Sequence, residues 1–87
     1  MRPSQHPQPA LGLAIRQLRI KRGATQVSLA KEAGITSQVL SFIERGGTNP
    51  TWHTVKNLAA ALGVSVAKLA TLTEKIEADS ERNLGNG

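Results

Sequence analysis

The sequence contains no cysteine, one aspartate and two histidines. Without cysteine, neither a disulfide framework nor a thiolate metal site is possible, which is consistent with the reducing cytoplasm where we place the protein. The histidines are His6, near the N-terminus, and His53, and the aspartate is Asp79, near the C-terminus. No carboxylate pair, histidine cluster or glycine-rich phosphate loop can be assembled from these residues. We therefore expect a protein that is not an enzyme and has no catalytic residues, no metal and no cofactor.

Long apolar runs are also missing. No run approaches the roughly 20 residues needed to cross a bilayer. The N-terminus lacks the apolar core of a signal peptide. We therefore expect no membrane association. A chain of 87 residues has room for one small domain with a modest core.

The charge that the chain does carry is unevenly distributed. Residues 1–73 contain nine Lys or Arg and two Glu, whereas residues 74–87 contain two basic and four acidic residues. A basic body with an acidic tail is typical of a protein whose body approaches a polyanion such as nucleic acid. The alternative is that the charge only keeps a small protein in solution.

The chain divides into three parts. Residues 1–9 include three prolines and almost no apolar side chains, so we expect a disordered N-terminal arm. Residues 10–73 show helical periodicity, and residues 74–87 extend the last helix before the chain frays from residue 83. No segment shows the alternation of a strand. The sequence predicts an all-α fold, a compact bundle of five helices.

Turn and cap residues give the helix bounds outside the central motif. The first helix is expected over residues 10–22 and the fourth over residues 52–62, capped by Thr51. The fifth helix follows Ser65, which can cap it. Trp52 shares a helical face with the apolar residues of the fourth helix, so we expect its indole in the core.

The most informative pattern is a pair of short helices in the middle of the chain. Thr25 is suited to cap the first of them, and Gly34 ends it because glycine readily adopts a positive φ. Thr36 can then cap a second helix whose apolar residues, Leu40 and Ile43, lie three apart. A helix, a glycine-containing turn and a second helix form the signature of the DNA-binding helix-turn-helix.

The chain resembles the Xre/Cro-type helix-turn-helix family, which includes phage repressors and small bacterial regulators. The resemblance covers roughly residues 11–72. It rests on five segments in family order and spacing, IRQLR (15–19), GATQVSLAKEAGIT (23–36), LSFIERG (40–46), NPT (49–51) and LAAALGVS (58–65). It implies a lambda-repressor-like domain that acts as a sequence-specific, double-stranded DNA-binding transcriptional regulator, with residues 36–45 as the major-groove recognition helix.

The resemblance assigns base contacts to the start and the outward face of the second helix, at Ser37, Gln38, Ser41 and Phe42. Glutamine can bond the N6 and N7 of adenine, serine can pair with several base edges, and an apolar group can meet the thymine methyl. Phe42 replaces the polar residue often found at its position. It either packs on a thymine methyl or a sugar, or is a partly buried surface aromatic without a reading role. For all four, the alternative is a plain solvated helix face.

The resemblance also implies phosphate contacts. Gln26 matches a family glutamine that touches a phosphate and braces the second helix, at a helix N-terminus whose free N–H groups favour anions. Asn49 and Thr51 stand where the family makes its other backbone contact, although loop and cap duty would also explain them. Generic basic candidates are Arg16, Arg22, Arg45 and Lys56. Arg19 and Glu44 match positions that commonly pair, so we expect a structural ion pair that orients the recognition helix.

One small domain contacts few bases, so we expect a homodimer on a palindromic operator. The apolar stripe of the fifth helix, Leu69, Leu72 and Ile76, predicts a dimer contact there and at the end of the fourth helix. Alternatively, the fifth helix folds back and completes the monomer's own core, which leaves a weak dimer that forms only on DNA. The rival function is a protein-binding adaptor of the same fold, either an antitoxin of a toxin–antitoxin pair or a factor bridging to the transcription machinery.

Overall fold

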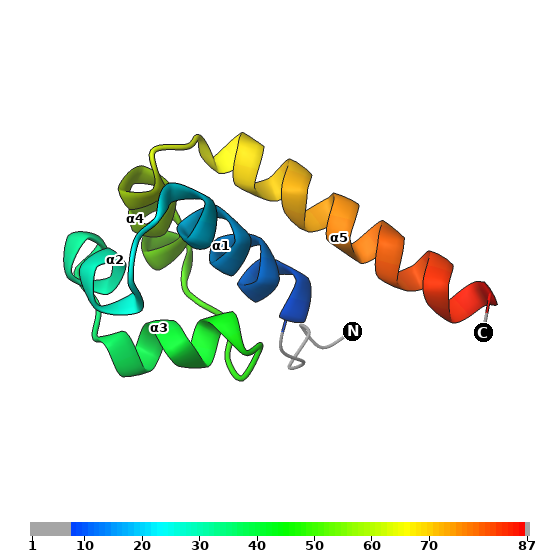
Figure 1. The fold of residues 1–87 in the computed structure, drawn as a ribbon, viewed down its shortest axis with the longest axis horizontal. Helices are drawn as coiled ribbons and strands as arrows, with labels where there is room; N and C mark the ends of the chain where they lie inside the picture. Colours follow the sequence, from blue (N-terminus) through cyan, green and yellow to red (C-terminus); the bar gives the residue numbers. More distant parts are fainter. Residues whose placement is uncertain (1–7, 87) are drawn as a thin grey trace.

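The computed structural model describes residues 8–86, with side chains as far as residue 82. It contains five helices, α1 (Pro9–Arg22), α2 (Gln26–Ala33), α3 (Ser37–Glu44), α4 (Trp52–Leu62) and α5 (Val66–Asn86) (Figure 1). No strand occurs in this part of the chain. The all-α fold with five helices is therefore confirmed.

Threonine side chains cap the N-termini of three helices. The Oγ1 atoms of Thr25, Thr36 and Thr51 each accept a hydrogen bond from the backbone N–H three residues later, at distances of 3.0–3.2 Å. Each bond satisfies one of the amide groups that a helix N-terminus leaves without a partner. Gly34 ends α2 with φ of 76°, a conformation that other residues rarely adopt. Because these signals are local, the bounds of α2, α3 and α4 follow closely from the sequence.

The two ends of the chain differ from expectation. Pro9, which we placed in the disordered arm, is the first residue of α1, and the N–H of Gln8 donates to Asn49 Oδ1 at 2.7 Å. Residues 1–7 of that arm lie outside the described residues. At the other end, α5 is helical to Asn86, although the sequence predicts fraying from residue 83.

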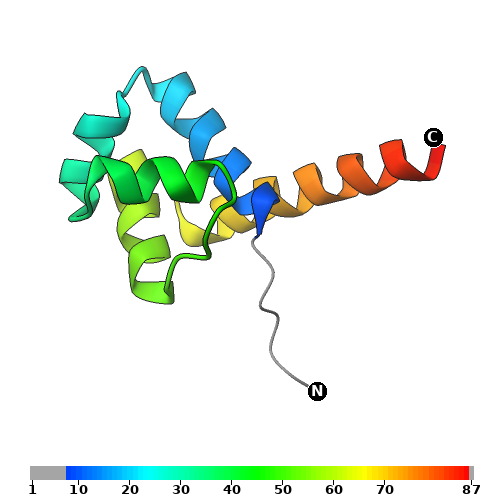
Figure 2. The same ribbon diagram turned by 90° about the horizontal axis from the view of Figure 1, so that it is seen from below.

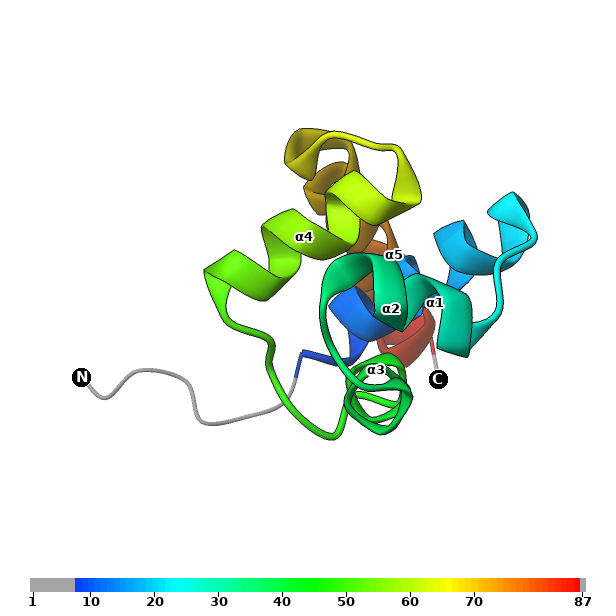
Figure 3. The ribbon, with the colours of Figure 1, turned by 90° about the vertical axis from the view of Figure 1, so that its left-hand side faces the viewer.

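The core lies between α1 and the other helices. The largest fully buried side chains are Ile15, Leu29, Leu40, Ile43, Leu58 and Leu69, so every helix contributes at least one. α5 runs diagonally across α1, whereas α3 packs against α1 and α2 on the opposite side of the molecule (Figures 1 and 3). α1 is therefore the helix through which α3 and α5 are joined.

The expected burial of Trp52 is wrong, because 64% of its surface is exposed. The periodicity of α4 identified the correct face, since Leu58 and Leu62 on that face are buried. Trp52, however, is the first residue of α4 and lies at the end of the helix, where the core no longer reaches. Helical spacing gives the direction of a side chain but not the extent of the core along the helix.

The stripe on α5 largely serves the monomer. Leu69 is 1% exposed, and Leu72 and Ile76 are partly buried against the core. The alternative that the fifth helix completes the domain's own core therefore describes the structure better than a stripe left for a dimer. Within residues 8–86, no single helix is long and apolar enough to cross a membrane. α4 and Val66–Arg82 meet that criterion only as a pair, bent by 100°.

Candidate nucleic-acid interface

Helix α3 lies on the outside of the molecule and extends across the front of the view in Figure 2. Leu40, Ile43 and Glu44 are buried against the rest of the domain, whereas Gln38 and Phe42 are exposed. Gln38 and Phe42 are four residues apart and therefore share one helical face. α3 thus has one face committed to the fold and another open to a partner.

The four predicted base-contact residues differ in exposure. Gln38 is exposed, and Phe42 is 50% exposed, whereas Ser37 and Ser41 are partly buried. Ser37 and Ser41 are also four residues apart, so they form a second row beside that of Gln38 and Phe42. The structure therefore brings all four together on α3, with the glutamine and the phenylalanine extending furthest into solvent.

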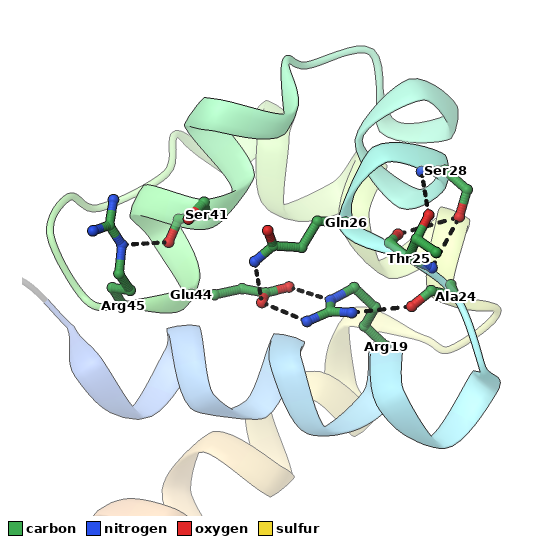
Figure 4. A network of polar contacts seen from close by, with 8 residues as sticks. All are labelled: Arg19, Ala24, Thr25, Gln26, Ser28, Ser41, Glu44 and Arg45. Atoms are coloured by element: carbon green, nitrogen blue, oxygen red, sulfur yellow. Dashed lines mark hydrogen bonds and ion pairs between the residues drawn. The ribbon is translucent and has the colours of Figure 1, made fainter.

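The back of α3 is attached to α1 by a charged hydrogen-bond network (Figure 4). Arg19 Nε lies 2.7 Å from Glu44 Oε2 and Arg19 Nη2 lies 3.0 Å from Glu44 Oε1, so the ion pair is bidentate. Gln26 Nε2 donates to the same Oε1 at 3.0 Å, and Arg19 Nη1 donates to the Ala24 carbonyl oxygen at 3.0 Å. The ion pair that the resemblance implied is thus present. The hydrogen-bond network around it also includes Gln26, the first residue of α2.

This network is well suited to fix the orientation of α3 because its side chains are almost fully buried. The side chains of Arg19 and Glu44 are 12% and 2% exposed. The hydrogen bonds that Arg19 donates to Glu44 raise the pKa of Arg19 above its ordinary value, so the guanidinium stays charged at any physiological pH. No buried side-chain nitrogen or oxygen among the described residues lacks a hydrogen-bond partner. A bidentate arginine–carboxylate pair restricts orientation in a way that a point contact cannot, so the network limits the tilt of α3 on α1.

A glycine that we did not single out from the sequence completes this junction. A Cβ built on Gly12 in α1 would clash with the carbonyl oxygen of Ile43 in α3, so the two backbones are in direct contact. A glycine inside a helix is unfavourable by itself, by roughly 0.5–1 kcal/mol relative to alanine. That cost was the available signal that Gly12 has a packing role.

The predicted phosphate-contact residues come from α1, α2 and α4 and from the segment that joins α3 to α4, and they differ in exposure and in the bonds they already make. Gln26 is partly buried and uses its amide for Glu44, while Thr51 caps α4 and Asn49 accepts a hydrogen bond from the backbone of Gln8. The remaining four, Arg16, Arg22, Arg45 and Lys56, are all exposed. Arg22 forms an exposed ion pair with Glu32 at 3.3 Å, a contact that water and a phosphate can both replace.

The described residues contain no group of three His, Cys, Asp or Glu side chains that could bind a metal ion. An exposed helix joined to its predecessor through a glycine turn, in a domain with exposed basic side chains, defines the class of helix-turn-helix DNA-binding domains.

Comparisons with known proteins agree with that class. A family model described as "Helix-turn-helix" matches residues 15–69. The uncharacterized HTH-type transcriptional regulator y4dJ of Sinorhizobium fredii is 42% identical over 75% of this chain and 84% of its own. The immunity repressor protein of Bacillus phage phi105 is 37% identical over 68% of this chain, but the match covers only 41% of the repressor.

Solved structures show the same fold. The clp gene regulator ClgR of Corynebacterium glutamicum superposes with a TM-score of 0.81 at 27% identity, covering 91% of this chain and 86% of that one. The restriction-modification controller protein C.AhdI of Aeromonas hydrophila gives a TM-score of 0.70 at 29% identity, covering 71% and 94%. The chain belongs to the Xre/Cro-type helix-turn-helix family of DNA-binding transcriptional regulators.

Proposed function

We propose that the protein regulates transcription by placing residues 36–45 in the major groove of a specific duplex sequence. The observation that carries this proposal is the division of α3, whose buried face is anchored by Glu44 while Gln38 and Phe42 face outward. An α-helix fits the major groove, where every base pair presents a distinct pattern of donors, acceptors and methyl groups. A rigidly mounted helix with polar and apolar tips can therefore select a sequence.

Each candidate residue has a distinct proposed role. Gln38 forms a bidentate pair with an adenine, Ser37 and Ser41 contact neighbouring edges or phosphates, and Phe42 makes an apolar contact. Backbone phosphates are bound by the N-terminus of α2 at Gln26, by the start of α4, and by the exposed basic side chains. These phosphate contacts fix the register in which α3 meets the bases. The compartment we propose is the cytoplasm, where such a regulator meets the chromosome.

We further propose that the regulator binds a palindromic operator as a homodimer. Because Leu69 is buried and Leu72 is partly buried, we place the dimer contact at an open groove beside the α5 stripe, with Leu69 in its lining. This groove, of about 370 Å³, lies between the start of α1, α4 and α5, and Trp52 and Ala70 are exposed on its lining. A two-fold contact presents the same patch twice, so an exposed indole beside an apolar groove can be self-complementary. Binding to a palindromic site requires the two α3 helices of such a dimer to lie about 34 Å apart, one turn of DNA.

Selection of bound sequences from random duplex DNA, followed by titration over a range of salt concentrations, tests the central proposal. We expect one enriched motif, and a plot of log K against log salt with a slope of roughly −0.9 for each neutralised phosphate. No enrichment, together with a slope near zero on every duplex, would contradict DNA binding.

The dimer is tested by sedimentation and by DNA titration of Ala70→Glu. Ala70 is exposed in the groove, so a glutamate there should weaken self-association and operator affinity without unfolding the monomer. Ala78→Glu on the exposed side of the same helix is the matched control. Equal behaviour of the two variants would exclude this groove as the dimer surface.

A further inference from the structure

The ring of Phe42 is held in place by its own chain. A Cβ built on Gly47 would lie 2.8 Å and 2.9 Å from the ring atoms Cε1 and Cδ1, so the ring rests on the Gly47 backbone at a distance that only glycine allows. The Gly47 N–H donates to the Phe42 carbonyl oxygen at 2.9 Å, which keeps the loop beneath the ring.

Arg45 holds the ring from a second direction. Its Cζ atom lies 5.6 Å from the centroid of the Phe42 ring, within the range of a cation–π contact. Arg45 Nε also donates to the Ser41 carbonyl oxygen at 3.3 Å, so its side chain lies back along α3 (Figure 4). Phe42 is therefore a preplaced group, and little side-chain entropy remains to be lost when it meets a partner.

What the ring offers to a partner is apolar surface. Phe42 is 50% exposed on the face that it shares with Gln38, and its hydrocarbon edge can neither donate nor accept a hydrogen bond. In the major groove, the apolar feature of a base edge is the C5-methyl group of thymine. The same methyl group at the same ring position distinguishes 5-methylcytosine from cytosine.

We propose that Phe42, held by Gly47 and Arg45, reads a C5-methyl group at one position of each half-site. The inference rests on the proposed function, in which α3 enters the major groove. Binding is then sensitive to the methyl group itself, so thymine is distinguished from uracil. Where the contacted pyrimidine is cytosine, methylation of the DNA at C5 strengthens binding. The regulator would in that case respond to the methylation state of its site.

The test uses the full chain and the duplex enriched from random DNA. Each thymine is replaced singly by uracil, which deletes only the methyl group. We expect one position per half-site where this replacement weakens wild-type binding about fourfold, the equivalent of about 0.8 kcal/mol for one buried methyl-sized group. A 5-methylcytosine·guanine pair at that position should bind about fourfold more tightly than cytosine·guanine.

Variants then assign the effect to the ring. Phe42→Ala should bind the thymine and uracil duplexes equally at that position. Gly47→Ala should also reduce the difference while leaving the melting temperature nearly unchanged, because the added Cβ displaces the ring and not the core. Val39→Ala is the matched control, since Val39 is a 43% exposed apolar residue of the same helix and should leave the difference intact.

Three results would overturn the inference. They are the absence of any thymine–uracil difference in wild type, a difference that persists in Phe42→Ala, and a difference that disappears equally in Val39→Ala. Each would leave sequence-specific, salt-dependent binding in place. Failure to enrich any duplex contradicts the proposed function as well and is therefore distinguishable from these results.

Discussion

The two faces of α3 use similar residue types for opposite purposes. On the buried face, the carboxylate of Glu44 is 2% exposed and accepts hydrogen bonds from Arg19 and Gln26. On the outer face, Gln38 is exposed, and the Phe42 residue is 50% exposed. Eight residues thus contain both a fully satisfied polar anchor and an incompletely covered surface.

The difference shows how a short helix is made rigid. A helix of this length is marginal alone, because nucleation is costly and few hydrogen bonds follow it. The buried face supplies the missing stability through Leu40, Ile43 and the Glu44 network, so the outer face can keep side chains that contribute little to folding. Changes on the first face should alter stability, and changes on the second should alter binding alone.

Of the predicted changes, removing the Glu44 side chain should have the largest effect, a loss of folding stability. Glu44→Ala leaves the guanidinium of Arg19 and the amide of Gln26 without their acceptor, and breaking a buried pair costs about 3–5 kcal/mol. Because Arg19 is 12% exposed, we expect a value toward the lower end. Urea denaturation measures the change, with Glu32→Ala, at an exposed ion pair, as the control expected to lose less than about 1 kcal/mol. Equal losses in the two variants would mean that the anchor is not special.

Adding a methyl group at Gly12 should cause the next largest loss of folding stability. The Cβ of Gly12→Ala meets the carbonyl oxygen of Ile43, which is backbone and cannot rotate away, so α1 and α3 must separate. Overpacking of this kind costs about 1–3 kcal/mol. Gln17→Ala, at an exposed position in the same helix, is the control for placing alanine in α1 without a clash. A Gly12→Ala protein as stable as wild type would show that the two backbones are not in tight contact.

Truncation of Gln38 tests the outer face. Gln38→Ala should lower affinity for the enriched site by about 1–3 kcal/mol and relax base preference at one position of each half-site. Its melting temperature should match that of wild type, because the side chain is exposed. Gln17→Ala serves again, now as a glutamine truncation outside α3. Unchanged affinity for both cognate and scrambled duplexes would remove α3 from the role of recognition helix.

The smallest effect is expected at a phosphate contact. Lys56 is exposed on α4, and Lys56→Ala should weaken binding to all duplexes about equally and reduce the salt slope by roughly 0.9. Lys75→Ala, in the acidic part of α5, is the matched lysine control. A change in sequence preference in Lys56→Ala would contradict a purely electrostatic role.

The comparison also explains which features the sequence predicts. The bounds of α2, α3 and α4 were predictable because threonine caps and glycine turns act over three or four residues. The pairing of Arg19 with Glu44 came from the resemblance, since 25 residues separate them and no local rule connects them. Whether α3 contacts bases through Ser37, Gln38, Ser41 and Phe42 stays a prediction.

Other features depend on distances that a linear pattern does not contain. The predicted burial of Trp52 was wrong because periodicity assigns a helical face without showing where the core ends. The contacts of Gly12 with Ile43 and of Gly47 with Phe42 each depend on how two elements meet in space. Both contacts require a residue without a side chain. Hydrophobic periodicity is a pattern of side chains and therefore does not reveal them.

The attachment of Gln8 to the loop after α3 has a practical consequence. The Gln8 N–H is bonded to Asn49, and a Cβ on Gly46 would lie 3.1 Å from Pro9 Cα, so α1 begins beside the end of the recognition helix. The end of α5, in contrast, lies away from α2 and α3 (Figures 1 and 2). In the proposed complex, with α3 in the major groove, an affinity tag or fluorophore joined before Gln8 would begin beside the bound duplex. A label carried at the far end of α5 would report binding without competing for it.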